Sequence, residues 1–399
     1  MKRRLTGILA ALKREVFMVL HDTNMRTILL IAPVFYSLMY GFIYINKTET
    51  NVKISVWDED RSNTTRELIR KIDAHQLIEV ENYSTSFSEV RENIYTDDVQ
   101  GIIHFPKDFE KELKRGKQST IKLYLNTTRF LPSNDINKGI NEVVFNFNNE
   151  LKEKFFASRG LNASLAEAVI QPVKEDVRFL FNPAATYGDF IIPGILLIIL
   201  QQTLLIGLSE SIGKEREEKT LGELYRISKK SITSLIAGKG MFYLLFYTVY
   251  SFFFFTFNLY LFGINMNGSL LLFIGLTILF ITTIIIWGIG IASFFTRKIF
   301  ALQTIALTSY PVFFLSGYAW ATSSMPELLQ QISLLIPSTP YFNAAVRIVF
   351  MGAGFNDILP EFLHIIILLS TGLAFTFIRL SLLLPKTLKP EQLPEAVSS

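Results

Sequence analysis

Residues 190–208 read FIIPGILLIILQQTLLIGL, and this stretch decides the fold class. None of its nineteen residues carries a charged side chain. A helix of that length covers about 28 Å, which is enough to cross the hydrocarbon core of a bilayer. The stretch therefore predicts a membrane-spanning helix, and the chain around it repeats the pattern.

Five other segments have the same apolar character, which predicts an α-helical integral membrane protein with six transmembrane helices. The expected spans are 27–45, 190–208, 241–263, 270–295, 299–319 and 363–384. The first span resembles a signal peptide in its position. However, about 26 residues precede it and no small-x-small cleavage site follows closely, so we expect it to be retained.

Half of the 399 residues are hydrophobic, a fraction that soluble domains also reach. Their distribution is informative, because they concentrate in the six runs while residues 47–186 have the composition of a soluble domain. The absence of cysteine excludes disulfides and thiolate chemistry. The four histidines are dispersed, so no metal site is expected, and the net charge of +4 suggests no nucleic-acid partner.

Lysine and arginine residues predict the orientation, since short cytoplasmic connections are enriched in them. Nineteen lie outside residues 47–186, and eighteen of these fall in the N-terminus, the 209–240 loop, the 297–298 turn or the C-terminal end. Only Arg347 falls in the alternate set of connections. We therefore expect both termini in the cytoplasm and the segment between the first two spans outside.

Residues 46–189 predict an extracytoplasmic α/β domain inserted between the first two spans. Strand-like and helix-like segments alternate over residues 52–125 in the order β-α-β-α-β-α-β, which implies an at least partly parallel sheet. A capping box at Thr64–Glu67 is expected to open the first helix, and Pro106 a later one. Residues 133–182 then have a helical pattern and are expected to form a stalk leading to the second span.

Three further segments complete the expected organisation. Residues 1–26 predict a cytoplasmic amphipathic helix that lies in the inner interface of the membrane. In residues 320–361, the part at 325–352 combines three prolines with a short apolar run, and the segment is expected to form an extracytoplasmic helical hairpin or re-entrant segment. Residues 385–399 are expected to form a cytoplasmic tail.

The cytoplasmic loop at 209–240 contains the most concentrated charge in the chain. Residues 214–231, KEREEKTLGELYRISKKS, carry four acidic and six basic side chains in a helix-prone segment between two spans. A solvated tether and a surface on which another protein docks are the two interpretations of such a segment.

The run from Glu215 to Leu224, followed by Gly238 and Lys239, resembles the loop between the second and third spans of type-2 ABC exporter permeases. In that family a motif of the form E-R-E-x-G-T-x-E-x-L-x-x-T-P leads to a G-K pair at the next span. Lys219 stands here where the family usually has Gly, and Ser228 stands near the usual Pro.

Other segments resemble the same family in order and spacing. They are VWDEDRSNTTRELIRKI at 56–72, GIIHFPKDFEKELKRG at 101–116 and the region 315–350 after the fifth span. The likeness covers nearly the whole chain, and it is closest to the subgroup with a large extracytoplasmic domain between the first two spans.

The resemblance implies that the loop forms a coupling helix, which docks in a cleft of a separate ABC ATPase subunit. Charged side chains would set register and association rate, and a few apolar side chains would anchor the contact. The residues implied in docking are Glu215, Arg216, Glu217, Glu218, Lys219, Thr220, Leu221, Glu223, Leu224 and Tyr225.

The resemblance also implies the partners and the location. The permease would form a homodimer or heterodimer, bind two copies of the ATPase subunit, and lie among lipids in a bacterial inner membrane; a periplasmic adaptor protein is a further conceivable partner. The P-loop pattern GxxxxGK[ST] is absent from this chain. The chain is therefore not expected to be an enzyme or to bind a cofactor, and ATP with Mg²⁺ would be held by the ATPase subunit.

Polar residues inside the spans are candidates for a translocation path. They are Gln201, Gln202, Thr203, Thr282, Thr283 and Trp287. Hydrogen bonding between helices is the alternative interpretation of each. A pathway with so little charge suits a hydrophobic or amphipathic substrate, such as a drug or a lipid.

A second function class remains open on the sequence alone. A membrane-anchored envelope protein could use the external α/β domain to bind or assemble a partner without transport. A membrane-embedded enzyme is a weaker third, because no Ser-His-Asp or GxSxG arrangement occurs in the inserted domain.

Overall fold

The computed structural model describes residues 2–96, 99–158, 180–182 and 186–387, and the chain divides into two compact units. Residues 1–47 together with 179–399 form the membrane unit, and residues 48–178 form the α/β unit. The part of the expected stalk after residue 158 and most of the expected C-terminal tail lie outside the described residues.

Among the residues that the structure describes, the membrane unit has six helical segments long and apolar enough to cross a bilayer, which confirms the expected number of spans. They are Thr23–Ile43, Tyr187–Glu217, Ile232–Leu261, Leu270–Ala292, Lys298–Leu315 and Asn356–Pro385. Helix α1 (Lys2–His21) precedes the first of them.

The second and third spans are longer than their apolar runs. Helix α9 (Tyr187–Glu217) begins after the N-cap Thr186, and it continues nine residues past the expected end of the span at residue 208. Helix α11 (Ile232–Phe252) begins nine residues before the expected start at residue 241. The expected loop 209–240 is therefore reduced to residues 218–231, because polar residues continue both helices beyond the part that needs lipid.

The first span is built from three consecutive helical pieces. They are α2 (Thr23–Arg26), the π-helix η1 (Thr27–Ile31) and α3 (Ala32–Ile43). A π-helical turn disturbs the regular backbone ladder. The hydroxyl of Tyr250 compensates by donating to the carbonyl oxygens of Leu29 and Leu30, at 2.9 and 3.1 Å.

The remaining helices follow in chain order. Helix α11 continues as the π-helix η2 (Phe253–Asn258) and α12 (Leu259–Leu261), and the later spans are α13 (Leu270–Ala292), α14 (Lys298–Leu315) and α17 (Leu359–Thr387). Between the last two lie η3 (Thr322–Ser324), α15 (Glu327–Ser333), α16 (Ser338–Met351) and η4 (Asn356–Ile358). Helices α15 and α16 meet at a bend of 79°, the geometry of a broken span or a re-entrant loop.

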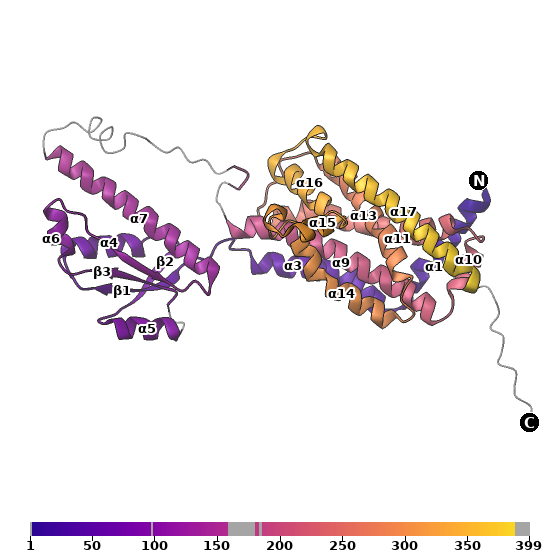
Figure 1. Ribbon diagram of the computed structural model, residues 1–399, viewed down its shortest axis with the longest axis horizontal. Coiled ribbons are helices and arrows are strands. Elements are labelled where there is room, and N and C mark those ends of the chain that lie inside the picture. Colours follow the sequence, from indigo (N-terminus) through magenta and orange to yellow (C-terminus); the bar gives the residue numbers. More distant parts are fainter. Residues whose placement is uncertain (1, 97–98, 159–179, 183–185, 388–399) are drawn as a thin grey trace, which may run out of the picture. The chain divides into compact units, whose positions relative to one another are not determined.

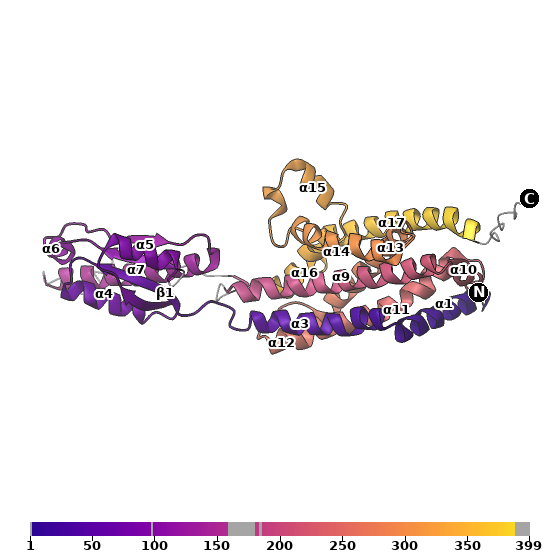
Figure 2. The same ribbon diagram turned by 90° about the horizontal axis from the view of Figure 1, so that it is seen from below.

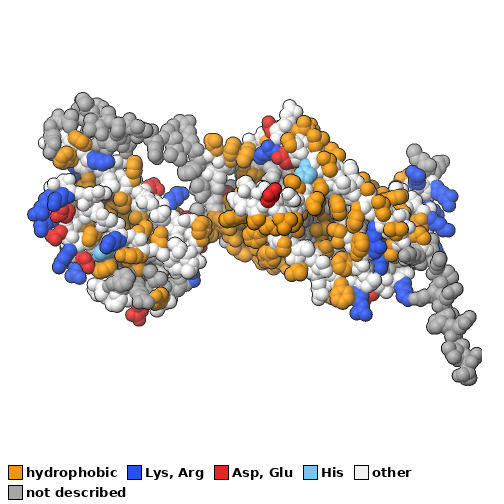
Figure 3. Space-filling model, viewed as in Figure 1, with side chains coloured by type: hydrophobic (Ala, Val, Ile, Leu, Met, Phe, Trp, Pro, Cys, Tyr) orange, Lys and Arg blue, Asp and Glu red, His pale blue; other side chains and the backbone are white. Residues whose placement is uncertain are grey.

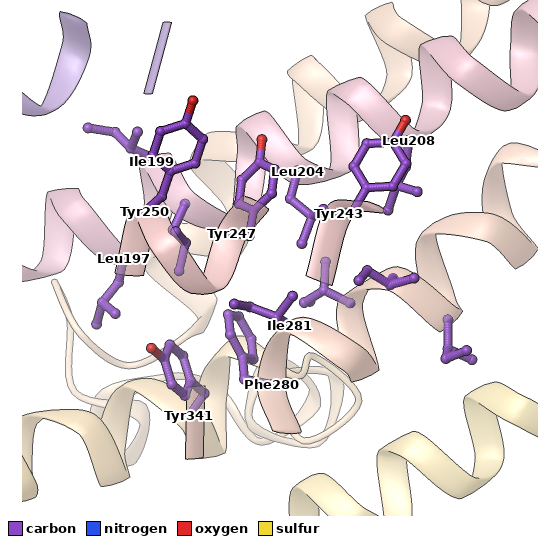
Figure 4. Packing of buried hydrophobic residues seen from close by; sticks show 14 of the residues in the cluster. Leu197, Ile199, Leu204, Leu208, Tyr243, Tyr247, Tyr250, Phe280, Ile281 and Tyr341 are labelled. Carbon is purple, nitrogen blue, oxygen red and sulfur yellow. The ribbon is translucent and has the colours of Figure 1, made fainter. Parts of the chain in front are cut away.

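Helix α9 is the central helix of the membrane unit. In its apolar window 78% of the residues are buried, against 11% in that of α14. Figure 4 shows side chains from α9, α11, α13 and α16 packed together around it. The outer surface of the unit is largely hydrophobic (Figure 3), as expected of helices whose other faces contact lipid.

The α/β unit contains a four-stranded sheet in the order β2-β1-β3-β4. The strands are β1 (Val52–Asp58), β2 (Ile78–Tyr83), β3 (Gly101–Phe105) and β4 (Lys122–Leu125). Strand β1 is parallel to β2 and β3, and β4 is antiparallel to β3. The sheet is therefore mixed, and its elements follow the order β-α-β-α-β-α-β.

Helices cover both faces of this sheet. Helices α4 (Asn63–Asp73) and α7 (Phe130–Ala157) lie on one face and α5 (Phe87–Tyr95) on the other (Figure 1). The side chains of Val52, Ile54 and Val56 point to the α4 and α7 face, because alternate residues of a strand point to opposite faces.

Two expected helix starts in the α/β unit are wrong by two residues. Helix α4 begins at Asn63 because the side chain of Ser62, not Thr64, accepts the cap hydrogen bond from the backbone N–H of Thr65 at 3.2 Å. Helix α6 (Phe109–Lys114) begins after Asp108, whose φ of 63° is left-handed, so the segment after Pro106 is a turn first.

Candidate functional site

Residues 214–231 do not form the single helix that the sequence predicts. They form the last turn of α9, a first turn, the short helix α10 (Leu221–Ile227) and a second turn before α11. Lys219, Lys229 and Lys230 have left-handed backbones with φ of 59°, 58° and 56°. Left-handed residues end a right-handed helix, so these lysines divide the segment.

The first turn closes the end of α9 with two backbone hydrogen bonds. The N–H of Thr220 donates to the carbonyl of Glu215 at 2.9 Å, and that of Lys219 to the carbonyl of Arg216 at 3.3 Å. This is the Schellman arrangement, which places a left-handed residue, usually Gly, just after the helix. Lys219 occupies that place, which is also where the resembling family usually has Gly.

Helix α10 is held from one side by Arg14 of α1. The guanidinium donates to both carboxylate oxygens of Glu215, at 3.0 and 3.2 Å, and to Glu223 at 3.0 Å. Burial would lower the pKa of Arg14, but the hydrogen bonds and charges of Glu215 and Glu223 outweigh burial and raise this pKa. Arg14 thus ties the end of α9 and the start of α10 to α1.

Beside this contact lies a polar cluster inside the unit, centred on Glu15 of α1. Glu15 and Lys239 form an ion pair in which both side chains are 1% exposed. The hydroxyls of Ser211 and Tyr243 also donate to Glu15, at 2.6 and 2.7 Å. The cluster therefore joins α1 to α9 and α11 by hydrogen bonds that satisfy a buried charge.

Glu15 was not expected to be a site residue, although the sequence holds a signal for it. Gly7, Ala11, Glu15 and Val19 are buried and recur every four residues along α1. This stripe faces the unit, while the larger apolar residues Leu5, Leu9, Phe17 and Leu20 are exposed. The apolar pattern of α1 therefore marks its outward face, and small residues with one charge mark the packed face.

The packed face of α1 lies very close to α11. A methyl group added at Gly238 would lie 2.6 Å from the Cβ of Ala11 and 2.6 Å from the carbonyl oxygen of Ile8. Such an approach requires glycine at position 238. Gly238 thus allows the contact, and the neighbouring Lys239 supplies the charge that meets Glu15.

The end of α9 also contacts the starts and ends of other spans. Arg216 donates to the carbonyl of Ser293 after α13 at 2.9 Å, and Glu217 accepts from the backbone N–H of Lys298 at the start of α14 at 3.0 Å. Lys214 pairs with Asp22 at 2.6 Å. The last turn of α9 therefore connects directly to α2, α13 and α14.

The structure places the expected docking residues in two groups. Glu215, Leu221 and Leu224 are 1%, 4% and 1% exposed, so in this conformation their side chains are covered by the chain itself, and their role in docking stays a prediction. They are buried because α10 packs on α17 and α1. The remaining expected residues are exposed or half-buried on the outer side of the segment, and they are Arg216, Glu217, Glu218, Lys219, Thr220, Glu223 and Tyr225.

Three further charges extend the exposed side of the segment. They are Arg226, Lys229 and Lys230, all of them exposed. With Glu217, Glu218 and Glu223 they form a surface of mixed charge, called the α10 surface below. The end of α17 and the start of α1 lie at the same end of the unit as α10 (Figures 1 and 2).

The expected translocation-path residues of α9 lie in the buried interior. Gln201 accepts a hydrogen bond from the hydroxyl of Ser338 in α16, and Thr203 donates to the carbonyl of Ile199 in its own helix at 2.7 Å. Both polar atoms of the Gln202 side chain are buried without a hydrogen-bond partner among the described residues. Gln202 therefore keeps polar groups available inside the unit.

The candidates on α13 are satisfied locally. Thr282 and Thr283 donate to carbonyls one turn earlier, at 2.7 and 2.9 Å, and the indole of Trp287 donates to the carbonyl of Leu368 in α17 at 2.9 Å. The bond of Trp287 joins two helices, as the alternative interpretation describes, whereas the bonds of the two threonines lie within α13. In the described part of the chain, no group of three acidic or histidine side chains is placed to hold a metal ion.

Comparisons with known proteins give one family. The profile of the family described as "ABC-2 family transporter protein" matches residues 25–380. The chain is 22% identical over 360 residues to "Probable multidrug ABC transporter permease YbhR" of Escherichia coli K12, covering 90% of this chain and 94% of that one.

Two other relatives from the same organism agree. The identity to "Probable multidrug ABC transporter permease YbhS" is 22% over 369 residues, covering 91% of this chain and 92% of that one. The identity to "Inner membrane transport permease YhhJ" is 26% over 282 residues, covering 70% and 71% of the two chains.

Proposed function

This chain belongs to the ABC-2 family of transporter proteins, and on that premise we propose that it is a permease that exports a hydrophobic or amphipathic substrate. It is the multi-pass membrane subunit of an ABC transporter, and family membership implies a separate ATPase subunit and dimerisation. ATP and Mg²⁺ bind to two copies of that ATPase subunit. A periplasmic adaptor gains no support from the comparisons.

The α10 surface is the docking site for the ATPase subunit. Its exposed charges of both signs supply register and fast association, while Tyr225 and Ile227 are half-buried at its edge. The observation that carries the proposal is that α10 is attached to other helices of the membrane unit through side chains behind this surface. Arg14 holds α10, and the Glu15 cluster joins α1 to α9 and α11, so a force on α10 reaches three helices at once.

The orientation follows from charge. Eighteen of the nineteen Lys and Arg outside residues 47–186 lie in the N-terminus, the 209–240 loop, the 297–298 turn or the C-terminal end, which supports a cytoplasmic location for the α10 surface and both chain ends by the positive-inside rule. The α/β unit is then extracytoplasmic, since it is inserted after the first span.

The substrate class follows from the interior of the unit. Its spans pack mainly through apolar and aromatic side chains, and the side chain of Gln202 in α9 has no hydrogen-bond partner among the described residues. A strongly charged solute would lose its hydration without finding counter-charges in such a pathway. A drug-like or lipid-like amphiphile needs only a few hydrogen bonds there, and the names of two relatives specify multidrug transport.

The test is a charge exchange on the α10 surface. Glu218→Lys with Arg226→Glu keeps the net charge and changes two exposed side chains. We expect the complex with the ATPase subunit to weaken about tenfold or more, with loss of substrate-stimulated ATP hydrolysis, because the charges then oppose their counterparts.

The matched control exchanges charges in the α/β unit. Lys152→Glu with Glu153→Lys changes two exposed side chains of α7 and should leave both readouts unchanged. If the α10 exchange leaves ATPase binding and stimulation intact in a folded protein, the docking proposal is wrong. If the α7 exchange alone abolishes a partner's binding, the envelope-binding function is favoured instead.

A further inference from the structure

The membrane unit contains a cavity of about 300 Å³, lined by both polar and apolar groups, far from the α10 surface. It is bounded by η3, α15, α16 and the first turns of α17, and its lining includes Thr322, Gln330, Asn343, Glu361 and His364. The last residue of α17, Thr387, touches Gly222 of α10. The cavity therefore lies roughly 35 Å along α17 from α10, at the end that the proposed orientation places outside.

Several lining groups are free to bind a ligand. The amide of Asn343 and the hydroxyl of Thr322 make no hydrogen bond within the described chain. His364 contacts the carbonyl of Leu334 through Nε2 at 2.8 Å, and Gln330 donates to the carbonyl of Met325 at 2.9 Å, which leaves its side-chain oxygen as an acceptor. A cavity of this size is at the lower end of small-ligand pockets.

An ion pair lies at the edge of the cavity. Glu361, which lines it, pairs with Arg347 of α16, and the two side chains are 22% and 33% exposed. Within the described chain, Glu361 Oε2 and Arg347 Nη2 are buried atoms without a well-oriented hydrogen bond. Buried charged groups in native proteins are usually satisfied by hydrogen bonds. Those two atoms face each other in the pair, whereas Glu361 Oε1 and the other guanidinium nitrogens of Arg347 make no hydrogen bond within the described chain. Glu361 therefore offers a negative group to the cavity, and Arg347, which is not itself in the lining, offers a positive group beside it.

Apolar side chains surround this polar site. Leu328, Leu334 and Leu335 of the α15 region are 68%, 53% and 70% exposed, and Leu363 of α17 is 49% exposed. In Figure 3 a small group of acidic, basic and histidine side chains is visible in an otherwise hydrophobic part of this unit. The surface therefore matches a molecule with a polar head and apolar chains.

We propose that this cavity binds the zwitterionic head of a membrane amphiphile from the outer leaflet, an ammonium and a phosphate on one head group. The ammonium pairs with Glu361 and the phosphate with Arg347, so the head matches the ion pair charge for charge. Asn343 and Thr322 hydrogen-bond the remaining oxygens. The acyl chains lie over the exposed leucines. The site rests on the proposed orientation but not on transport, since binding requires no ATP.

The experiment uses the full chain without the ATPase subunit in phosphatidylglycerol nanodiscs, whose host lipid has no ammonium group. The probe is spin-labelled phosphatidylethanolamine, whose immobilised fraction reports bound lipid. We expect Glu361→Gln to reduce its affinity about tenfold or more, because a charge-assisted hydrogen bond to the ammonium is lost. Asn343→Leu should reduce it similarly by filling the cavity, and it leaves the ion pair untouched. Glu327→Gln, the same change at an exposed residue outside the lining, should have no effect.

Head-group comparisons identify the ligand chemistry. Spin-labelled phosphatidylglycerol, which lacks the ammonium, should be immobilised at least about tenfold less strongly. Equal binding of the two lipids, or unchanged binding in both Glu361→Gln and Asn343→Leu, would overturn the proposal. Displacement of the probe by free phosphoethanolamine as effectively as by lipid would also overturn it, because the ligand would then come from solution. Loss of the ATPase complex would leave all of these readings unaffected.

Discussion

Glu15 and Lys239 form an ion pair that is nearly inaccessible to solvent, between α1 and α11 of the membrane unit. Their positions are 224 residues apart in the chain. The carboxylate of Glu15 has two further donors, Ser211 and Tyr243, whereas Lys239 has Glu15 as its hydrogen-bond acceptor. The two partners are therefore unequally supported, and this asymmetry can be measured.

Removing either charge should destabilise the protein, and Glu15→Gln should cost more than Lys239→Met. The first leaves a buried ammonium without its counter-charge, which costs about 3–5 kcal/mol. The second leaves a carboxylate that still accepts from two hydroxyls. Thermal unfolding of the detergent-purified chain measures both. The double variant should be more stable than Glu15→Gln alone, and equal costs for the two single variants would contradict this account.

Gly238→Ala should weaken the packing of α1 on α11. The added methyl meets the Cβ of Ala11 and the backbone of Ile8 at 2.6 Å, and overpacking of this kind costs about 1–3 kcal/mol. Gly275→Ala in α13 is the control, because a methyl there meets nothing within 4 Å. Since alanine favours helix over glycine by about 0.8–1 kcal/mol, the control should keep or raise the melting temperature. A fall of equal size in both variants would refute the close approach.

Lys219→Gly should stabilise the turn after α9. The left-handed backbone at position 219 costs a residue with a Cβ about 1–2 kcal/mol, and glycine avoids this cost. Part of that gain is lost because glycine also gives the unfolded chain more conformational entropy. Lys219→Ala removes the same side-chain contacts but keeps the Cβ. The informative quantity is therefore the difference in unfolding free energy between the two variants, about 1 kcal/mol in favour of glycine. Equal stabilities would mean that the turn is not strained.

The ion pair between Asp22 and Lys214 predicts a pH dependence. Burial would raise the pKa of Asp22, but Lys214 and the backbone N–H groups of Met25 and Asn24 outweigh burial and lower it below the ordinary value of 3.8. An acid with a lowered pKa in the folded state contributes stability above its unfolded pKa and loses it as pH falls through the folded pKa. The contribution should therefore be complete at neutral pH, begin to fall near pH 3.8, and be lost as the pH drops through the lower pKa of the folded state.

Two substitutions separate the charge of Asp22 from its capping role. Asp22→Asn can still accept from the N–H groups that begin α2, so at pH 7 it should cost less than about 1 kcal/mol for a partly exposed pair. Asp22→Ala also loses the cap and should cost about 1 kcal/mol more. Melting curves between pH 7 and pH 3 test this. The difference in melting temperature between Asp22→Asn and the wild type should vanish in acid. The difference between Asp22→Ala and Asp22→Asn should remain.

The helices of the membrane unit are predictable from the sequence because lipid requires long apolar runs, and all six runs become spans. Their ends are less predictable. The segment 209–217, SESIGKERE, reads as a loop, yet it continues α9, since Ser211, Arg216 and Glu217 gain partners that only the folded unit supplies. The start of α4 differs from the expected one for a local reason: Ser62, rather than Thr64, is the N-cap residue.

The docking segment shows the same limit on sequence reasoning. Leucines in a charged helix suggest anchors for a partner, but Leu221 and Leu224 are covered by the chain itself. Glu15 was missed because a charged residue in an amphipathic helix is normally placed on the polar side. The four-residue spacing of Glu15 with Ala11 and Val19 places it on the buried face of α1. That placement is plausible only if a buried cation lies opposite, and the cation, Lys239, is far away in the sequence.

Helix α9 runs without interruption from Tyr187 to Glu217, a length of roughly 46 Å, which exceeds the thickness of the hydrocarbon layer. Apart from Pro193, which has no backbone N–H to donate, its backbone is hydrogen-bonded and resists compression, so a displacement at Glu217 is expected to appear at the opposite tip as tilt. Gly194 near that tip fits against the ring of Tyr318, where an added methyl would come within 2.1 Å. A small rotation at the inner end of α9 should therefore move Gly194 relative to the ring of Tyr318. This movement would open or close the far side of the helix bundle.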